Sequence, residues 1–488
     1  MKNIWLILII KFIFPIQGQS QFDNNWIIGI DRSSSNEFPM IVDFNSGFPI
    51  TKKIDGKDIN FFLFSNSISN EFGQLLFYTN GLKIFNRDNE IMENGDTIIS
   101  QENYDYWNAI ANLGSPGISG YIIPAPGLDQ IYYLFYSDFH YEPDLYRYYF
   151  RSPLYLCVID MEENQGLGKV VLKKQIILDG ALSHFGLVKH ANGRDWWVVV
   201  PELNSDVFYN YLITPQGILG PQIFYSGFTQ NEFYATGRNK FSPNGELFIR
   251  NYHQWGTTIY NFDRCSGKIT YKNSLFYKDG NEHFDFDIEC SPNNRYLYIS
   301  EFYTLSLGSS KGGNTRIWQY DLNVEDIERT GVIAAQSDLH FAILPNLLTR
   351  MQLSPLNNIF VSSKDEANVF SYIERPDLPA PYCNVSQHNF QLPSSNLATA
   401  PRFPNYKLKK IFGSPCDTIQ FQNIEEIADL DKTTNFDSIK LIKLNMDLLK
   451  NSYLYKCNFT RLSGTPMAKD IESLKFYIKY IEQNNRIK

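Results

Sequence analysis

The stretch FSPNGELFIRN, residues 241–251, decides the fold because its pattern returns twice later in the chain. CSPNNRYLYIS occupies residues 290–300, and LSPLNNIFVSS occupies residues 353–363. In each copy a Ser-Pro pair leads into a turn that contains Asn or Gly, and a short apolar run follows. Proline fixes φ at the first corner of a turn, and Asn or Gly tolerates the next corner. The copies therefore predict three tight turns, each leading into a β-strand.

The same strand-and-turn pattern extends from about residue 26 to residue 408. Apolar runs are short, rich in aromatic and β-branched residues, and separated by Gly, Asn, Asp, Ser and Pro, which is typical of antiparallel strands. A second motif, a strand ending in Asp before a turn, recurs in YNFDRCSGK (260–268), IWQYDLNVED (317–326) and CVIDMEENQG (157–166). Long segments with helical periodicity are absent here, which disfavours an α/β sheet.

The repeat spacing predicts an all-β fold. Ser291 follows Ser242 by 49 residues, and Ser354 follows Ser291 by 63. Units of roughly 50–60 residues over residues 21–419 correspond to about seven four-stranded blades closed in a ring, a β-propeller. Two stacked β-sandwiches are the alternative, which the repeat length disfavours.

We expect the last blade to join the two ends of this region. It would combine the first strands, at 25–30 and 39–44, with FPNYKL at 403–408. Such pairing of the termini closes a ring without an exposed sheet edge.

The composition limits the classes of protein to consider. The chain has 488 residues, a formal net charge of −8 and 15% aromatic residues. So much apolar surface excludes disorder as the main state. The acidic balance argues against a nucleic-acid partner, since phosphate binding requires a basic face.

Residues 1–20 have the order of a secretory signal peptide. Lys2 precedes an apolar core at 4–16, which Lys11 interrupts, and small and polar residues follow at 18–20. The apolar stretch is shorter than the roughly 20 residues of a membrane span, and Lys11 would be unfavourable at mid-bilayer. We therefore expect export, and no transmembrane segment after cleavage.

Six cysteines are too few for a disulfide scaffold in so long a chain. Cys157 lies in an apolar, strand-like run and is expected to be a buried free thiol. The other five lie in or near turn-like or polar sequence, where one or two bridges are permitted but spacing does not define the pairing. No CxxC motif occurs, so a zinc ribbon is not predicted.

Several strings together resemble the secreted β-propeller module at the N-terminus of many large Bacteroidetes surface proteins. They include QLLFYTNG (74–81), KHANGRDWW (189–197), LITPQGI (212–218), CSPNNRYLYIS (290–300), FPNYKL (403–408) and GSPCDT (413–418). The resemblance covers about residues 22–418 and implies a WD-repeat-like propeller with a surface location and a binding or scaffold role. It offers no catalytic residues to carry over.

Members of that family usually continue into a PKD-type domain and a type IX secretion sorting domain associated with gliding motility. This sequence departs from the pattern after Thr418, because residues 420–488 contain neither domain. Apolar residues spaced from 471 to 481 fit one face of a helix, so we expect a short, helical C-terminal extension of unknown role. A calcium-loop-like string at 429–440 lacks the required Gly and closing Glu.

The densest polar string, KHANGRDWW, supplies the binding candidates His190, Arg194 and Asp195. At a pocket mouth, a His–Asp pair could serve acid–base chemistry. The structural alternative is favoured: a hairpin turn at residues 192–193, with these side chains bonded to nearby backbone.

Trp107, Tyr146 and Tyr148 are further binding candidates, from two aromatic segments read as loops, YDYW (104–107) and YEPDLYRYYF (141–150). Exposed Tyr and Trp on propeller loops can stack on sugars or anchor a partner protein. Packing between blades is favoured for aromatics in strands, whereas for these two segments both roles stay open.

An alternating acidic strand follows His283 and places Asp285, Asp287 and Glu289 on one face. Carboxylates grouped in this way could hold a cation. A solvated face, or hydrogen bonds at the edge of a blade, is favoured instead. We predict no metal site and no cofactor.

The sequence contains no P-loop or HExxH motif, and no GxGxxG before a helix. We expect a non-catalytic binding or scaffold module at the cell surface or in the periplasm, with a protein or polysaccharide of the envelope as partner. The alternatives are a glycan-active hydrolase or lyase with its site in the central channel, and a passive spacer. Carboxylates or a His converging at the channel with shifted pKa values would favour the enzyme.

Overall fold

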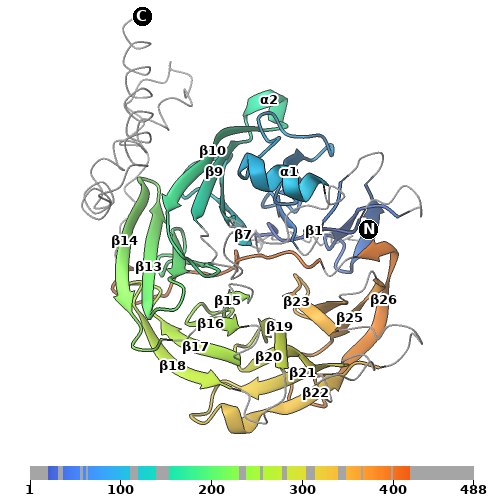
Figure 1. The fold of residues 1–488 in the computed structure, drawn as a ribbon, viewed down its shortest axis with the longest axis vertical. Coiled ribbons are helices and arrows are strands. Elements are labelled where there is room, and N and C mark those ends of the chain that lie inside the picture. The colour runs from blue at the N-terminus through green and yellow to red at the C-terminus, as the bar shows by residue number, and fades with distance from the viewer. Residues whose placement is uncertain are drawn as a thin grey trace, which may run out of the picture.

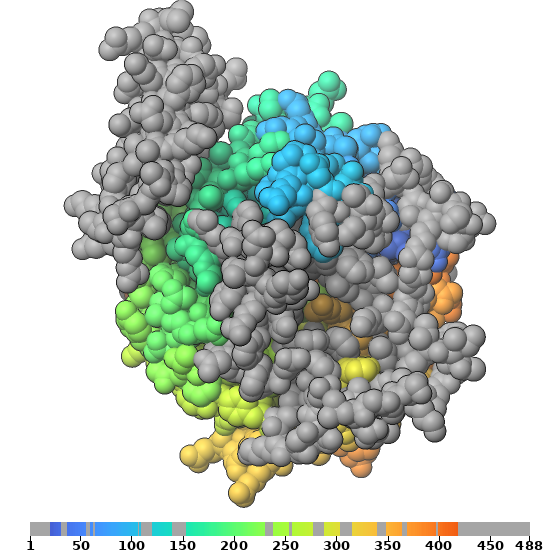
Figure 2. All heavy atoms as spheres, in the orientation of Figure 1, coloured from blue at the N-terminus to red at the C-terminus, as the bar shows by residue number. Residues whose placement is uncertain are grey.

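The computed structural model describes residues 20–417, apart from 31–36, 55–58, 62–63, 110–118, 139–152, 230–237, 253–255, 277–282, 304–313, 339–347, 364–366 and 397–398. These residues form seven antiparallel sheets around a common centre (Figure 1). The fold is therefore the seven-bladed β-propeller that the repeat length predicts. The expected four strands are present in five blades, whereas the described residues of the first two blades form three strands each. In the space-filling view of Figure 2 the colours follow one another around the ring in chain order.

Each blade is a run of consecutive strands. The first blade contains β1 (Asn25–Ile28), β2 (Met40–Asp43) and β3 (Ile50–Lys53). The second contains β4 (Asn66–Ser69), β5 (Leu75–Thr79) and β6 (Ile84–Asn86). The third contains β7 (Ser119–Pro124), β8 (Ile131–Ser137), β9 (Leu154–Asp160) and β10 (Lys169–Leu178). The next two contain β11 (Gly186–Lys189), β12 (Trp196–Pro201), β13 (Val207–Thr214) and β14 (Gly217–Tyr225); and β15 (Asn239–Phe241), β16 (Leu247–Tyr252), β17 (Gly256–Phe262) and β18 (Ile269–Leu275). The last two contain β19 (His283–Cys290), β20 (Tyr296–Tyr303), β21 (Asn314–Asp321) and β22 (Val332–Gln336); and β23 (Leu348–Leu353), β24 (Ile359–Ser363), β25 (Ala367–Ile373) and β26 (Val385–Asn396). The helices of this part of the chain are α1 (Gln101–Ala109), α2 (Glu163–Gly166) and a 3-10 turn at Glu328–Thr330.

The three Ser-Pro strings form the turns between the first and second strands of the last three blades, as predicted. In the first copy Ser242 N donates to Leu247 O (2.9 Å) and Leu247 N donates to the Ser242 hydroxyl (3.0 Å). Gly245, Asn294 and Asn357 occupy the same corner, with φ of 75°, 64° and 66°. This left-handed conformation explains why Gly or Asn stands at that position.

Aromatic side chains fill the contacts between blades. Phe208 of β13 packs on Phe248 and Tyr260 of the next blade, with ring centroids 6.1 and 5.2 Å apart. All three side chains are buried. A single sheet cannot bury both of its faces, so neighbouring blades bury them for one another.

Within the described part of the chain, the ring closes by side-chain contacts and not by a strand from residues 403–408, which corrects the prediction for the last blade. β1 and β2 form a sheet with β3, and residues 403–408 form no strand. Trp26 of the first blade instead packs edge-on against Phe360 of the last, with centroids 5.4 Å apart. Phe38 N also donates to Ser394 Oγ across this junction (2.8 Å).

After β26 the chain crosses the centre of the ring, as the orange ribbon of Figure 1 shows. Tyr406 donates its hydroxyl proton to Ile122 O of β7 (2.6 Å), and Asn405 Nδ2 donates to Pro243 O in the fifth blade (2.7 Å). We call residues 399–411 the crossing segment. It thus contacts both the third and the fifth blade.

The predicted leader, except for Ser20, and the C-terminal extension at 420–488 lie outside the described residues and stay predictions. Within the described part of the chain, no helix combines the length and the apolar character needed to cross a membrane.

Candidate functional site in the central channel

The inner strands of the last three blades carry charged and amide side chains at equivalent positions of the repeat. Four residues before the serine of each Ser-Pro turn stand Arg238, Asp287 and Arg350, and two residues before it stand Lys240, Glu289 and Gln352. Positions two apart in a strand share one face. Because β15 contacts β19 and β19 contacts β23, the repeat gathers these groups at the centre of the ring.

Two buried ion pairs join the fifth blade to the sixth. Arg238 Nη1 lies 2.9 Å from Asp287 Oδ2, and neither side chain is more than 1% exposed. Lys240 Nζ lies 2.5 Å from Glu289 Oε2. The acidic face that could have held a metal cation therefore binds cations of the chain itself.

The same two carboxylates reach the seventh blade. Met351 N donates to Asp287 Oδ2 (2.9 Å), and Leu353 N donates to Glu289 Oε2 (2.8 Å). Asp287 and Glu289 thus connect three consecutive blades, in line with the favoured role of hydrogen bonding at blade edges. A register shift between Asp285 and Asp287 interrupts the predicted alternation, and the side chain of Asp285 lies outside the described part of the structure.

Positive charge is in excess around Asp287. Burial by itself would raise the pKa of this carboxyl, but the neighbouring cations, above all Arg238, outweigh burial and lower it. Burial and the charge of Arg238 lower the pKa of Arg350 and of Arg402. Since a guanidinium stays protonated at neutral pH, several like charges share this region.

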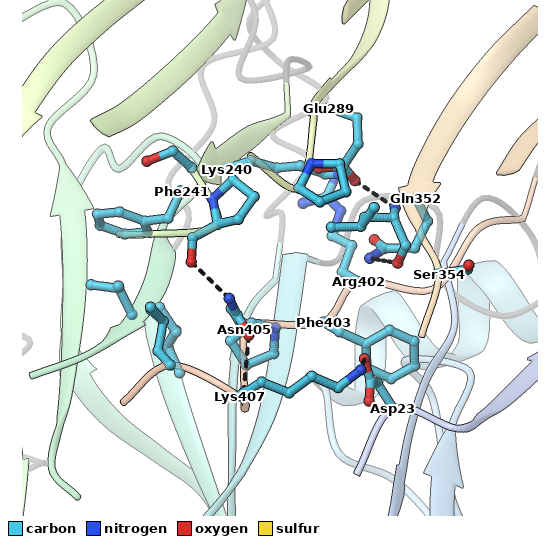
Figure 3. Close-up of a pocket in the computed structure, with 18 of the residues that line it drawn as sticks. Asp23, Lys240, Phe241, Glu289, Gln352, Ser354, Arg402, Phe403, Asn405 and Lys407 are labelled. Atoms are coloured by element: carbon cyan, nitrogen blue, oxygen red, sulfur yellow. Dashed lines mark hydrogen bonds and ion pairs between the residues drawn. The ribbon is translucent and has the colours of Figure 1, made fainter. Parts of the chain in front are cut away.

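A pocket of about 250 Å³ lies where residues 402–408 cross the channel (Figure 3). Its walls come from the inner strands of several blades, from Asp23 just before β1, and from the crossing segment. Its charged and amide side chains are Asp23, Lys240, Glu289, Gln352, Asn357, Arg402, Asn405 and Lys407.

Two acceptor atoms of residues that line this pocket, Gln352 Oε1 and Asp23 Oδ1, are themselves buried and receive no hydrogen bond from any described residue. Gln352 is only 6% exposed, and its Nε2 donates to Leu353 O (3.1 Å). Lys407 extends toward Asp23, with Nζ 4.0 Å from Oδ2 (Figure 3). Burial raises the pKa of the Asp23 carboxyl, and Lys407 offsets part of that rise.

The two carboxyl groups of the pocket are not equivalent. Both oxygens of Glu289 are occupied, Oε1 by Cys290 N (3.0 Å) and Oε2 by Lys240 and Leu353. Glycoside hydrolysis by the usual route needs two carboxyl groups that both reach the substrate. Among the described lining residues only Asp23 has a carboxyl oxygen that receives no hydrogen bond.

The candidates His190, Arg194 and Asp195 lie in the turn between β11 and β12 and do not line the pocket. His190 takes the place of the serine of the Ser-Pro turns: its N donates to Asp195 O (2.8 Å). Its Nδ1 accepts from Asn192 N (3.1 Å) and its Nε2 donates to Cys265 O (3.0 Å). Arg194 Nε lies 2.6 Å from Asp195 Oδ1. These are the contacts of a structural turn, and a binding role of the three stays a prediction.

His190 also lies beside Cys265 and Cys416, with one potential ligand atom of each within 4.8 Å of the others. The two sulfurs form a disulfide, a pairing that spacing had left open. A metal would need thiolates and an available imidazole nitrogen. Because the sulfurs are bonded to each other and both ring nitrogens are hydrogen-bonded, the cluster is a disulfide covered by a histidine.

Trp107 lies in α1, which corrects the loop expected at 104–107. The helix follows β6, the last strand of a three-stranded blade, and Trp107 packs half-buried against the core there. The two other aromatic candidates, Tyr146 and Tyr148, lie outside the described residues, so their role stays a prediction.

No family model and no curated protein matches this chain. Among solved structures, the periplasmic gluconolactonase of Pseudomonas aeruginosa aligns with a TM-score of 0.41 and 10% identity, over 76% of this chain and 97% of that one. Hydrazine synthase of Kuenenia stuttgartiensis aligns with 0.39 and 9%, over 72% and 94%. A protein of unknown function from Desulfotomaculum acetoxidans aligns with 0.36 and 12%, over 71% and 92%. Likenesses this distant assign neither a family nor an activity, and the Bacteroidetes resemblance stays an expectation.

Of the charged and amide residues that line the pocket, the sequence pointed in advance to Glu289 alone, as a member of the acidic strand. For Lys240 and Gln352 a signal exists, because both stand two residues before a repeated serine. For Asp23, Arg402 and Lys407 no local signal exists, since they reach the channel from the two ends of the propeller.

Proposed function

We propose that this chain is an exported β-propeller that acts as a non-catalytic binding module at the cell surface or in the periplasm. Its ligand is a small part of an envelope protein or polysaccharide, and that part sits in the central pocket. The chief support is the pocket itself, whose lining includes three cationic side chains and a glutamine with a buried amide oxygen that no described residue satisfies.

Rigidity is a second support. A binding site is held more accurately on strands than on loops. Lys240 lies in β15, Glu289 in β19 and Gln352 in β23, and ion pairs and backbone hydrogen bonds join these three blades. The predicted signal peptide supports the exported location.

A retention assay tests the proposal. Purified residues 21–488 are incubated with cell envelopes and with a panel of insoluble polysaccharides, and both bound protein and released products are measured in the same tubes. We expect retention without product, and weaker retention of Lys407→Met. Lys173→Met is the matched control: both lysines pair with an Asp and are 26% and 24% exposed, but Lys173 lies on the outer strand β10.

Each other outcome selects an alternative. Product release would contradict a non-catalytic module and would make Asp23 the first acid–base candidate. Retention that Lys407→Met leaves unchanged would move the binding surface from the pocket to the aromatic candidates Trp107, Tyr146 and Tyr148. Neither retention nor product would favour the passive spacer.

A further inference from the structure

We infer that the central pocket takes one small hydroxylated carboxylate, that is, a sugar acid. Its carboxylate would lie against Arg402 and Lys407, and its hydroxyl groups would donate to Gln352 and Asp23. This inference rests on the proposed function, because it names the ligand chemistry of the same pocket.

The charges of the pocket favour an anion. Lys240, Arg402 and Lys407 are its cations, while Asp23 and Glu289 are the acids among its described lining residues. Glu289 is already bound to Lys240 at 2.5 Å, and Asp23 Oδ2 lies 4.0 Å from Lys407 Nζ, which leaves the charge of Arg402 in excess among the described lining residues. Burial and the like charge of Arg238 lower the pKa of Arg402, and Arg402 in turn lowers the pKa of Arg350. A ligand carboxylate would offset this repulsion through charge-assisted hydrogen bonds.

The acceptors of the pocket require a ligand that also donates. Gln352 Oε1 and Asp23 Oδ1 receive no hydrogen bond from the described part of the chain. Burying an acceptor without a donor is unfavourable. A carboxylate can only accept, whereas hydroxyl groups donate. A ligand that suits both halves of the pocket therefore carries a carboxylate and hydroxyl groups together.

The size and walls of the pocket agree with one sugar unit. About 250 Å³ lies just below the roughly 300–1,000 Å³ of pockets that take drug-sized molecules. Phe241 and Phe403 line the same space (Figure 3). Their rings offer an apolar face to the C–H groups of a sugar ring.

Isothermal titration calorimetry on residues 21–488 tests the inference with four probes: sodium D-glucuronate, D-glucose, sodium acetate and inorganic phosphate. Glucose lacks the carboxylate, and acetate and phosphate lack the sugar hydroxyls. We expect glucuronate to bind, and the other three to bind at least about tenfold more weakly, because a site built to pair a polar group rejects the analogue without it.

Variants locate the binding. Lys407→Met and Gln352→Met should each weaken glucuronate binding about tenfold, whereas Lys173→Met should leave it unchanged. Thermal unfolding shows whether each variant is folded. Lys407 is 26% exposed and tolerates replacement better than Gln352. If Gln352→Met does not fold, Lys407→Met is therefore the variant that tests the site. Glucuronate binding that neither folded variant weakens would overturn the inference.

The other outcomes separate this inference from the proposed function. Equal affinity for glucose, acetate or phosphate would overturn the sugar-acid ligand, and so would the absence of binding by all four probes. The retention assay would then still decide the proposed function by itself. Alginate beads, which present polymeric uronates, distinguish the two sources: retention that free glucuronate displaces indicates a uronate of a polysaccharide, and glucuronate binding without retention indicates a free acid.

Discussion

Asp287 is the residue on which three blades meet. It accepts hydrogen bonds from Arg238 Nη1 of the preceding blade and from Met351 N of the following one. A buried ion pair contributes little net stability, but removing one partner leaves the other charge buried and uncompensated. Removal of this carboxylate should therefore destabilise the contacts with both neighbouring blades as well as its own strand.

We expect Asp287→Asn to lower the free energy of unfolding by about 3–5 kcal/mol. Urea unfolding followed by tryptophan fluorescence measures this loss. Asp321→Asn is the control, because Asp321 pairs with Arg295 at 2.9 Å but Arg295 is 49% exposed. Its loss should be about 0–1 kcal/mol. Equal losses in the two variants would contradict the importance of burial.

His184 is held neutral at the edge of the same channel. Burial lowers its pKa well below the ordinary value, and the charges of Arg402, Arg350 and Arg238 lower it further. A histidine in the unfolded chain titrates near pH 6.5. Below that pH the unfolded state takes up a proton that the folded state does not, so acid favours unfolding.

The wild-type protein should therefore lose stability relative to His184→Gln as the pH falls below about 6.5. The expected difference in slope is up to about 1.4 kcal/mol per pH unit. Urea unfolding of both proteins from about pH 7.5 to pH 5 measures it. Parallel stability curves would show that His184 protonates as easily in the folded protein as in the unfolded chain.

At the scale of elements, the crossing segment is ordered although it is neither helix nor strand. Ile411 N donates to Ala191 O (2.8 Å), and Arg264 Nη2 donates to Lys409 O (2.9 Å). Just beyond it, the disulfide from Cys265 to Cys416 spans 151 residues of chain. Because this segment carries two cations of the pocket, its anchors also position the proposed ligand site.

Replacing both Cys265 and Cys416 by Ser should lower the free energy of unfolding by about 2–5 kcal/mol, because the unfolded chain loses a long cross-link. It should also weaken retention on the envelope or polysaccharide that binds the wild type. Thermal unfolding and the retention assay measure the two effects. A reductant should reproduce the loss in the wild type and change nothing in the double variant; a reductant effect of equal size in both would point to other cysteines.

At the scale of the whole molecule, the ring is closed by side chains. Trp26 lies between the first and the last blade, where Phe44, Phe360 and Phe370 belong to the same buried cluster. Such a junction depends on apolar burial and not on a hydrogen-bonded ladder. We therefore expect the closure to be the place where one truncation loosens both ends of the propeller.

Trp26→Ala should lower the free energy of unfolding by about 3–5 kcal/mol and speed amide hydrogen exchange in β1–β3 and β23–β26 together. Phe208→Ala is the matched truncation between the fourth and fifth blades, and should loosen β11–β18 instead. Hydrogen exchange followed by mass spectrometry measures both. Faster exchange confined to β1–β3 in Trp26→Ala would show that other contacts close the ring.

Two local predictions were wrong for reasons that particular residues show. FPNYKL at 403–408 alternates like a strand, but Pro404 has no N–H to donate and Asn405 bonds to Pro243 O of another blade. YDYW at 104–107 reads as a loop, yet Ser100 Oγ accepts from Asn103 N (3.2 Å) as a helix cap does. The helix cap at Ser100 was present in the local sequence, whereas the partner of Asn405 lies far along the chain.

The amino-acid sequence alone determined the seven-bladed architecture and its repeated turns, because turns and strands depend on residues a few positions apart and the repeat length depends on how often they recur. The Ser-Pro turns with Gly245, Asn294 or Asn357 at their left-handed corner show this directly. The pocket, the disulfide and the closure were decided only by the tertiary structure. Asp23 and Lys407 come from opposite ends of the propeller, and each contact forms because a closed ring brings distant residues within bonding distance.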